Sequence, residues 1–440
     1  MKNKILSRAS LFALLTAIFL LADFFAYAID KSSAATGKTV ILGDQRHKEY
    51  LPLLKGKRVA LFSNATGIVG DVVDGKPSRM LPTDATVDLP LLKPGSQRLG
   101  RHILDFLLAK RVNVTEVFSP EHGFRGDADA GQKVSGYTDE KTGVRVVSLY
   151  GVSGPVPKPE DVAKFDALVV DIQDVGLRYY TYYVTMLKLM NACAENGKKV
   201  IILDRPNPNG FYVDGPILDT LRFRSGVGAL PIPIVHGMTL GELALMSNGE
   251  GWLPSGKTCD LTVIPCENYT RDTKYSLIVQ PSPNLKTMRA VYLYASTCFF
   301  EGTNVSLGRG TEHPFEIYGH PALNLPDDGG ARFSFTPRSM PGAANPPCKD
   351  QLCYGRDLRK KPIADIWDEE INLEYFLEAH RNLGPEAFFF LKGNRFFELL
   401  VGVPWVRPMI AAGYDADTIK SRWAADIESF ERQRAKYLIY

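Results

Sequence analysis

The sequence predicts an α/β protein built on a mainly parallel sheet, and three patterns support this fold class. Apolar runs typical of buried strands alternate with amphipathic stretches typical of helices, as in a parallel sheet covered by helices on both faces. Three of these runs lead directly into carboxylates, at Glu121, Asp171 and Asp204. Gly197 follows the clearest helical repeat at the position where a glycine commonly ends a helix.

The strands and helices are expected in a regular order. Apolar runs predict strands at residues 58–62, 112–118, 144–149, 167–172, 199–204 and 232–235. Apolar residues at helical spacing predict helices over 101–111 and over the repeat that spans 180–194. Thr239-Leu-Gly-Glu242 is a capping box that predicts a helix running to Ser247. The chain ends in a further helical pattern, with one face marked by Ile419, Trp423, Ile427 and Phe430.

Composition changes along the chain predict its division into parts. Residues 1–28 have a basic start, an apolar run and the small-residue site Ala26-Tyr-Ala28, which predict a cleaved signal peptide and an exported protein. Residues 29–45 are expected to be a flexible leader, 46–260 a catalytic domain and 261–440 a C-terminal domain. Residues 70–100 interrupt the first β–α connection and are expected to be a surface excursion.

The net charge of the chain and the lengths of its apolar segments limit the kinds of partner that it is expected to bind. The whole chain has a formal net charge of +3, and removing the three basic residues and one acidic residue of 1–28 leaves +1. Such a balance gives no reason to expect nucleic acid or an anionic membrane as a partner. No segment after residue 28 has the apolar length that predicts stable membrane insertion.

All six cysteines lie after the predicted signal peptide. An exported protein meets an oxidising compartment, so the local pairs Cys259/Cys266 and Cys348/Cys353 are candidate disulfides. Cys193, inside a predicted helix, is expected to be a buried thiol.

The turn Ser119–Gly126 follows a predicted strand and carries Glu121, His122 and Arg125. A turn that leaves the carboxyl end of a buried strand is where open α/β sheets place ligands. A partly buried glutamate there would suit a general acid that protonates a leaving oxygen. The structural alternative is an ion pair between Glu121 and Arg125; the neighbouring histidine favours the functional interpretation.

Two further strand ends carry polar clusters. Asp171 and Gln173 share one strand face, and a carboxylate within such an apolar run would be costly to bury without partners. Asp174 fits a helix cap equally well, and Arg178 could bind an anion or pair with Asp174. Asp204, Arg205 and His236 lie at later strand ends, where turn chemistry is the alternative.

The predicted C-terminal domain adds a polar loop at 301–311. This loop lacks the lysine and the glycine spacing of a phosphate-binding loop, and no G-x-G-x-x-G follows the first strand. No H-x-H, H-E-x-x-H or G-x-S-x-G pattern is present either. We therefore expect no cofactor, no metal and no serine nucleophile.

Blocks of sequence in a fixed order resemble a bacterial family of exo-acting β-N-acetylmuramidases. They are 63–67, 119–126, 129–131, 139–143, 148–151, 171–181, 203–208, 236–242, 281–284 and 301–316. The resemblance implies a Rossmann-like domain, a smaller C-terminal α+β domain and an active site in the cleft between them. Ala65, where relatives often carry a bulkier residue, and the long 70–100 insert depart from the pattern.

The resemblance implies an enzyme that releases N-acetylmuramic acid from non-reducing ends of peptidoglycan fragments, MurNAc-GlcNAc among them. It assigns the catalytic acid to Glu121. Asp171 or Glu301 is then a candidate base, or steadies an assisting 2-acetamido group. The predicted substrate-binding residues are Asn64, His122, Arg125, Gln173, Asp174, Arg178, Tyr180, Thr181, Asp204, Arg205, His236, Asn284, Glu301, Asn304, Arg309 and Thr311.

One arginine among Arg125, Arg178, Arg205 and Arg309 is expected to bind the lactyl carboxylate, because its planar fork matches a carboxylate. An exported solute-binding protein for cell-wall sugars and a carbohydrate deacetylase or esterase stay open as alternatives. The sequence also leaves open whether the reaction inverts, retains or is assisted by the substrate.

Overall fold

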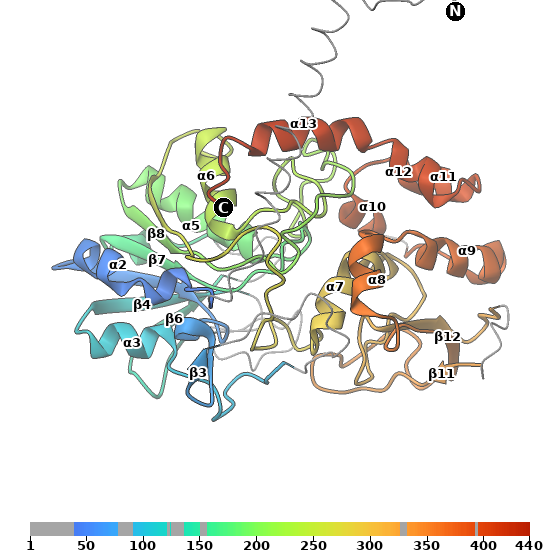
Figure 1. The fold of residues 1–440 in the computed structure, drawn as a ribbon, viewed down its shortest axis with the longest axis horizontal. Helices are drawn as coiled ribbons and strands as arrows, with labels where there is room; N and C mark the ends of the chain where they lie inside the picture. The colour runs from blue at the N-terminus through green and yellow to red at the C-terminus, as the bar shows by residue number, and fades with distance from the viewer. Residues whose placement is uncertain are drawn as a thin grey trace, which may run out of the picture. The chain divides into compact units, whose positions relative to one another are not determined.

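The computed structural model describes residues 39–77, 91–120, 124, 136–149, 156–325, 332–391 and 395–440. Val40–Tyr440 form one compact unit. Its main sheet has the strand order β5-β6-β4-β1-β7-β8-β9 (Figure 1). Neighbouring strands are parallel except for the β5–β6 pair. The strands are β1 (Arg58–Ser63), β4 (Asn113–Ser119), β5 (Tyr137–Thr138), β6 (Arg145–Ser148), β7 (Ala167–Asp171), β8 (Lys199–Leu203) and β9 (Asp260–Ile264).

Alternation along each strand sends side chains to two separate cores. In β1, Val59 and Leu61 face a smaller core covered by α2 (His47–Leu54) and α3 (Ile103–Ala109). Ala60 and Phe62 face the other core, which α5 (Tyr182–Glu195) and α6 (Leu240–Gly249) cover. The predicted α/β fold with a parallel sheet covered on both faces is therefore confirmed.

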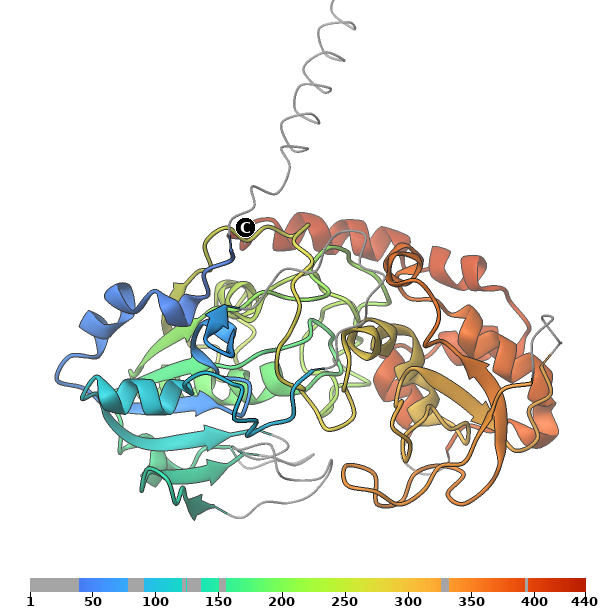
Figure 2. The ribbon, with the colours of Figure 1, turned by 60° about the horizontal axis from the view of Figure 1, so that its bottom comes forward.

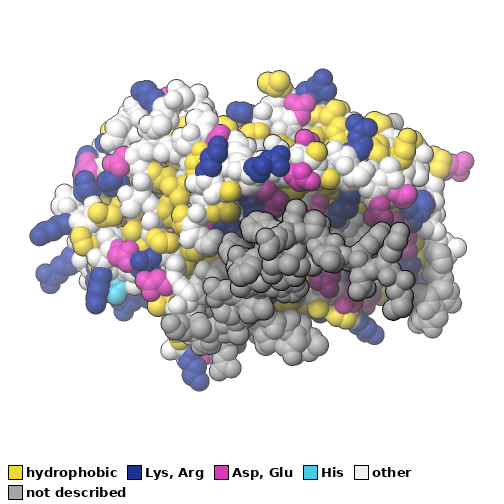
Figure 3. Space-filling model, turned by 45° about the horizontal axis from the view of Figure 1, so that its top comes forward, with side chains coloured by type: hydrophobic (Ala, Val, Ile, Leu, Met, Phe, Trp, Pro, Cys, Tyr) yellow, Lys and Arg dark blue, Asp and Glu magenta, His cyan; other side chains and the backbone are white. Residues whose placement is uncertain are grey.

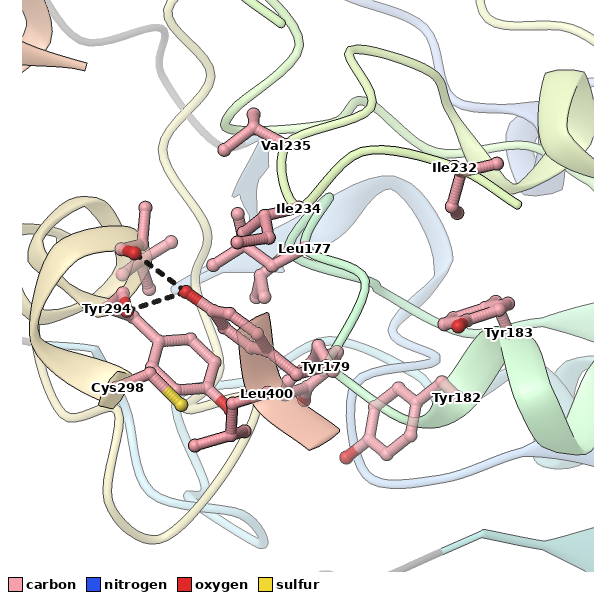
Figure 4. Packing of buried hydrophobic residues seen from close by; sticks show 14 of the residues in the cluster. Leu177, Tyr179, Tyr182, Tyr183, Ile232, Ile234, Val235, Tyr294, Cys298 and Leu400 are labelled. Carbon is pink, nitrogen blue, oxygen red and sulfur yellow. Dashed lines mark hydrogen bonds between the residues drawn. The ribbon is translucent and has the colours of Figure 1, made fainter. Parts of the chain in front are cut away.

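The larger core continues from the sheet into the C-terminal half of the chain. Figure 4 shows part of it, where the buried Tyr179 hydroxyl donates to the backbone carbonyls of Tyr294 (3.0 Å) and Ala295 (2.8 Å). A second sheet, in the order β10-β12-β11, lies in this half (Figure 2). The remaining elements are β2 (Val72–Val73), β3 (Lys76–Pro77), β10 (Ile317–His320), β11 (Ser334–Phe335), β12 (Cys353–Asp357), α4 (Pro159–Val162), α7 (Met288–Thr297), α8 (Ile363–Glu369), α9 (Glu374–Ala387), α10 (Phe396–Val401), α11 (Val406–Ala411), α12 (Ala416–Ser421) and α13 (Ala424–Arg434).

The structure corrects the predicted leader. Val40 and Leu42 are buried, and Ile41 forms an isolated bridge with Glu267. A short 3₁₀ helix, Gly43–Gln45, follows and buries Asp44. The prediction of a flexible leader is therefore wrong for residues 40–45; residues 29–38 and the predicted signal peptide lie outside the described residues.

The structure also differs from two predicted secondary-structure elements. Residues 232–235 form no strand; Val235 makes only isolated bridges to Leu177 and Asp214. The predicted terminal helix is divided into α12 and α13, although Ile419, Trp423 and Phe430 are buried as their spacing indicated. The boundary predicted at residue 260 falls on β9, an edge strand of the main sheet, and the division into domains stays a prediction.

The described residues include all six cysteines, and each is a free thiol. Cys259 and Cys266 flank β9, so a bridge would require an extended strand to fold back on itself. The predicted Cys259/Cys266 disulfide is therefore wrong, and Cys348/Cys353 is not bridged either. Cys193 is buried in α5, as expected.

Among the described helices, each is too short or too polar to cross a bilayer. On the face drawn in Figure 3, basic and acidic side chains are interspersed over the described part of the surface.

Candidate active site

Three neighbouring parallel strands, β4, β1 and β7, end at the same edge of the main sheet. From β1 the chain passes by way of α3 to β4 on one side, and it later crosses to β7 on the other side. Crossovers that leave in opposite directions create the crevice where open α/β sheets bind ligands. Asn64 and Gln173, which follow β1 and β7, are therefore at the expected position.

Glu121, His122 and Arg125 lie outside the described residues. The residues on either side of them are described: Pro120 and Phe124 are both buried. The Phe124 ring packs edge-on against the His102 ring, with 5.0 Å between centroids. The described residues that flank Glu121 are thus anchored, Pro120 at the end of β4 and Phe124 against the start of α3.

A cavity of about 260 Å³, which we call the inner hollow, opens beside this anchor. It lies at the N-terminus of α3 and adjoins a larger, open outer groove of about 650 Å³ that runs along the same helix. Gly100, Asp105 and Lys141 line both. The inner hollow is lined by Ala65, Ile68, Gly95, Ser96, Leu99, Gly100, His102, Asp105 and Lys141.

Sequence reasoning missed most of this lining. Gly95–Gly100 belong to the segment predicted as a surface excursion. That segment is anchored where Leu91 and Leu92 donate backbone hydrogen bonds to the carbonyls of Lys286 and Ile278. Lys141 lies in one of the blocks that carry the family resemblance, which was the available signal, whereas His102 had none.

A buried hydrogen-bond network lies next to the inner hollow. Asn64 Nδ2 donates to the Tyr182 hydroxyl (2.8 Å), which in turn donates to the Pro281 carbonyl (2.7 Å). The Tyr180 hydroxyl donates to the same carbonyl (2.6 Å). The structure thus brings together the predicted residues Asn64 and Tyr180 with the 281–284 block, through Tyr182.

His102 links this network to α3. Its Nδ1 accepts from the backbone N–H of Leu104 (3.1 Å), so its Nε2 donates to the Asn64 carbonyl (2.8 Å). These two bonds define a neutral imidazole. His102 therefore caps α3 and fixes the loop after β1 at the same time.

Asp171 and Arg205 belong to a buried ion-pair network. Arg205 contacts Asp171 Oδ1 (2.6 Å), Asp44 Oδ2 (2.7 Å) and Asp71 Oδ1 (2.8 Å), and the four side chains are almost fully buried. Burial opposes ionisation of Arg205, but the three carboxylates outweigh it and hold the pKa of its guanidinium well above its usual range. Burial raises the pKa values of Asp44 and Asp71. These contacts favour a structural role for Asp171 and Arg205 over the predicted catalytic and binding roles.

Asp174 is a buried acid with a pKa near neutrality. Its Oδ1 accepts from the backbone N–H of Gly176 (2.7 Å), and its Oδ2 has no hydrogen-bond partner. Burial raises its pKa to about 7. The Gln173 amide donates to the Asp174 and Pro206 carbonyls. Both residues line a separate cavity of about 10 Å³, which is only the size of a water molecule.

Asp204 and His236 have structural partners. Asp204 accepts from the hydroxyls of Thr239 (2.6 Å) and Tyr440 (2.7 Å), and from the Gly241 N–H (2.9 Å) at the start of α6. Burial raises its pKa to about 6 despite these bonds. Burial, with help from Arg434, lowers the pKa of His236 to about 3, so its imidazole is neutral.

Arg178 is fully buried and donates to four backbone carbonyls, those of Pro216, Ile232, Leu400 and Val401. Burial lowers its pKa to about 10. This arginine therefore connects the sheet to α10, and its contacts do not favour the predicted binding of an anion.

The other predicted residues lie in the C-terminal half or at the start of α5. Arg309 pairs with Glu301 (2.6 Å) and lies 5.3 Å from the Phe315 ring centroid. Asn284 donates to the Gly342 carbonyl, and the Asn304 amide donates to the Ala387 carbonyl. Thr311 donates to the Gly308 carbonyl, and Thr181 occupies the N-cap position of α5 without a side-chain capping bond. No contact of these residues with the inner hollow is found among the described residues.

Within the described ranges, no three His, Cys, Asp or Glu side chains are placed to hold a metal ion.

Comparison with known proteins identifies the family. Residues 91–289 match the N-terminal family model of the exo-beta-N-acetylmuramidase NamZ, and residues 292–440 match its C-terminal model. The chain belongs to the NamZ family. It is also 35% identical over 455 aligned residues to the peptidoglycan beta-N-acetylmuramidase NamZ of Bacillus subtilis, covering 98% of this chain and 100% of that protein.

Solved structures of the same kind support the fold. A DUF1343 family protein from Bacteroides fragilis is 51% identical, with a TM-score of 0.77, and covers 92% of this chain and 99% of its own. A second DUF1343 protein from that organism is 27% identical, with a TM-score of 0.68 over 91% of this chain and 99% of its own. Membership of the NamZ family confirms the predicted resemblance and the prediction of a glycoside hydrolase of the exo-β-N-acetylmuramidase type.

Proposed function

We propose that this chain removes N-acetylmuramic acid from the non-reducing ends of peptidoglycan glycans, with MurNAc-GlcNAc as its smallest substrate. The observation that carries the proposal is the inner hollow at the ends of β1 and β4, directly beside the anchor of the Glu121 segment, in a chain of the NamZ family. A cavity at a strand-end crevice suits one terminal sugar.

Glu121 is the proposed general acid. Its carboxyl proton passes to the glycosidic oxygen as the bond from that oxygen to C1 of the muramic acid breaks. A water molecule finally supplies the hydroxyl at C1 and returns its other proton to the Glu121 carboxylate. This role rests on the family resemblance of the turn that carries Glu121; the described residues on either side of it, Pro120 and Phe124, are buried. A general acid must stay protonated near neutral pH, which partial burial of a carboxyl group favours.

Both candidate bases are already paired with arginine: Asp171 with Arg205, and Glu301 with Arg309. This pairing supports the variant in which the 2-acetamido group of the substrate itself assists departure of the leaving group.

The proposed location is outside the cytoplasmic membrane, on the strength of the signal-like residues 1–28. Fractionation of cells that express the full chain would find the mature protein in the periplasm or medium, about 28 residues shorter by mass. Recovery of the uncleaved chain from the cytoplasm would contradict this location.

The proposal is tested with purified mature protein and MurNAc-β-1,4-GlcNAc, with and without a chelator, followed by mass spectrometry. We expect free N-acetylmuramic acid in both samples. Glu121→Gln should lower kcat at least 100-fold, the usual contribution of a general acid. Glu160→Gln, an exposed glutamate of α4, is the matched control and should retain full activity.

Other outcomes would favour the alternative functions. Binding of the intact disaccharide without cleavage would indicate a solute-binding protein, and release of acetate would indicate a deacetylase. Near-normal turnover by Glu121→Gln would overturn the assignment of the acid while leaving the activity intact.

A further inference from the structure

The group that recognises the lactyl carboxylate of muramic acid needs a cation, and the structure accounts for most of the arginines predicted for it. Arg178 donates to four backbone carbonyls, Arg205 pairs with three aspartates and Arg309 pairs with Glu301. Arg125 lies outside the described residues. Of the described residues that line the inner hollow, Lys141 is the one that carries a cationic side chain.

Lys141 is presented by a well-defined turn between β5 and β6. The Asp139 N–H donates to the Val144 carbonyl (2.8 Å), and the Gly143 N–H donates to the Asp139 carbonyl (2.8 Å). The Thr142 hydroxyl closes the turn by donating to the Asp139 carboxylate (2.6 Å). Backbone and side-chain bonds thus fix the point from which the lysine extends.

An ion pair places the ammonium group beside α3. Lys141 Nζ lies 2.5 Å from Asp105 Oδ2, in the first turn of α3, and the lysine side chain is 66% exposed. An ammonium group has three N–H donors, and Asp105 uses one. Lys141 lines both the inner hollow and the outer groove, so its remaining donors are available where the two hollows meet.

We propose that Lys141 binds the lactyl carboxylate of the terminal muramic acid, and that Asp105 is the positioning residue that holds the lysine at the mouth of the inner hollow. The inference rests on the proposed function and deepens it. Lys141 is then the residue that distinguishes muramic acid from N-acetylglucosamine, which lacks the lactyl group. A compact ammonium suits this task because it can satisfy Asp105 and a second carboxylate at once.

The test compares 4-nitrophenyl β-glycosides of N-acetylmuramic acid and N-acetylglucosamine. For Lys141→Met, we expect kcat/KM on the muramic acid substrate to fall about 10- to 100-fold, the factor for one hydrogen bond between charged groups. The loss should lie mainly in KM, and the rate on the glucosamine substrate should not change. Lys141→Arg should retain most of the selectivity, because it keeps the charge.

Two controls separate this role from a structural one. Lys158→Met removes an equally exposed lysine that is paired with Glu160 and lines neither hollow; it should behave as wild type. A muramic acid substrate whose lactyl carboxyl is a methylamide should be a poor substrate for the wild type, and Lys141→Met should lower its rate no further.

Equal losses on both sugars, or unchanged selectivity, would overturn the role of Lys141. These results are distinct from failure of the proposed function, in which the wild-type protein itself would leave the muramic acid substrate intact.

Discussion

At the scale of single residues, the carboxylates at the strand ends do different work although they look alike in sequence. Asp171 neutralises a buried arginine, and Asp204 caps a helix. Asp174 remains buried with one oxygen unpaired and a pKa of about 7. The number of donors does not separate them, since Asp171 also has an unpaired Oδ2. What differs is the charge of the partner: Asp171 lies against a buried arginine, whereas Asp174 has a neutral backbone donor and burial opposes its charged form.

The raised pKa of Asp174 predicts a pH-dependent stability. An aspartate in the unfolded chain ionises near pH 4, whereas Asp174 in the folded chain stays protonated up to about pH 7. Between these values the unfolded state binds fewer protons, so this residue lowers stability as pH rises, by up to about 1.4 kcal/mol per pH unit, with no further loss above pH 7.

Urea unfolding of wild type and Asp174→Asn at pH 4 to 8 measures this effect. Asparagine keeps the shape and the acceptor for Gly176 but does not titrate. The free energy of unfolding of the wild type should fall relative to that of the variant from pH 4 to 7. Above pH 7 the difference between the two free energies should stay constant. Parallel curves over the whole range would refute the buried, protonated state.

At the scale of elements, most of the secondary structure follows from local sequence signals. The apolar runs form β1, β4, β6, β7 and β8 within one or two residues of their predicted limits. The capping box forms as expected: the Thr239 hydroxyl accepts from the Glu242 N–H (3.2 Å), and the Glu242 carboxylate accepts from the Thr239 N–H (3.0 Å). Residues 232–235 fail to form a strand because no neighbouring strand pairs with them continuously.

The start of α6 offers a prediction at this scale. The Thr239 hydroxyl caps the helix and also donates to the buried Asp204 carboxylate. Thr239→Ala should lower the free energy of unfolding by about 2 kcal/mol or more, since an N-cap contributes about 1 kcal/mol and a buried acceptor also loses its donor. Thr239→Ser keeps the hydroxyl and should lose much less, as measured by urea denaturation. Equal losses in the two variants would assign the effect to the lost methyl group instead.

At the scale of the whole molecule, the sheet and the C-terminal helices share one continuous core. Arg178 and Tyr179, between β7 and α5, contact α10 and α7 respectively. Such contacts join the C-terminal half to the sheet through this shared core, while the division of the chain into two domains stays a prediction. The hollow beside α3 depends on this arrangement too. The segment that supplies Gly95–Gly100 to its lining is anchored by backbone hydrogen bonds from Leu91 to Lys286 and from Leu92 to Ile278.

The shared core predicts that residues from Val40 onward unfold in one cooperative step. Far-UV circular dichroism reports on helices throughout the chain, whereas three of the four tryptophans, Trp367, Trp405 and Trp423, lie in the C-terminal half. The denaturation curves from circular dichroism and from tryptophan fluorescence should therefore coincide. Separate midpoints would show that the two halves unfold independently.

The sequence by itself determined the α/β class, the order of strands and helices, and the strand-end positions of the polar clusters. These are local properties, since periodicity and capping depend on residues within a few positions of each other. It also carried the family resemblance, and with it the glycoside hydrolase activity.

Only the tertiary structure decided which of those polar residues are available to a ligand. Arg205 looked free to bind a carboxylate, but it is enclosed by Asp44, Asp71 and Asp171, which come from three distant segments. Lys141 lay in a block of family resemblance but was not among the predicted site residues, yet it lines the hollow beside α3. The partners of a charged side chain are set by long-range contacts, so its role is fixed only when the chain has folded.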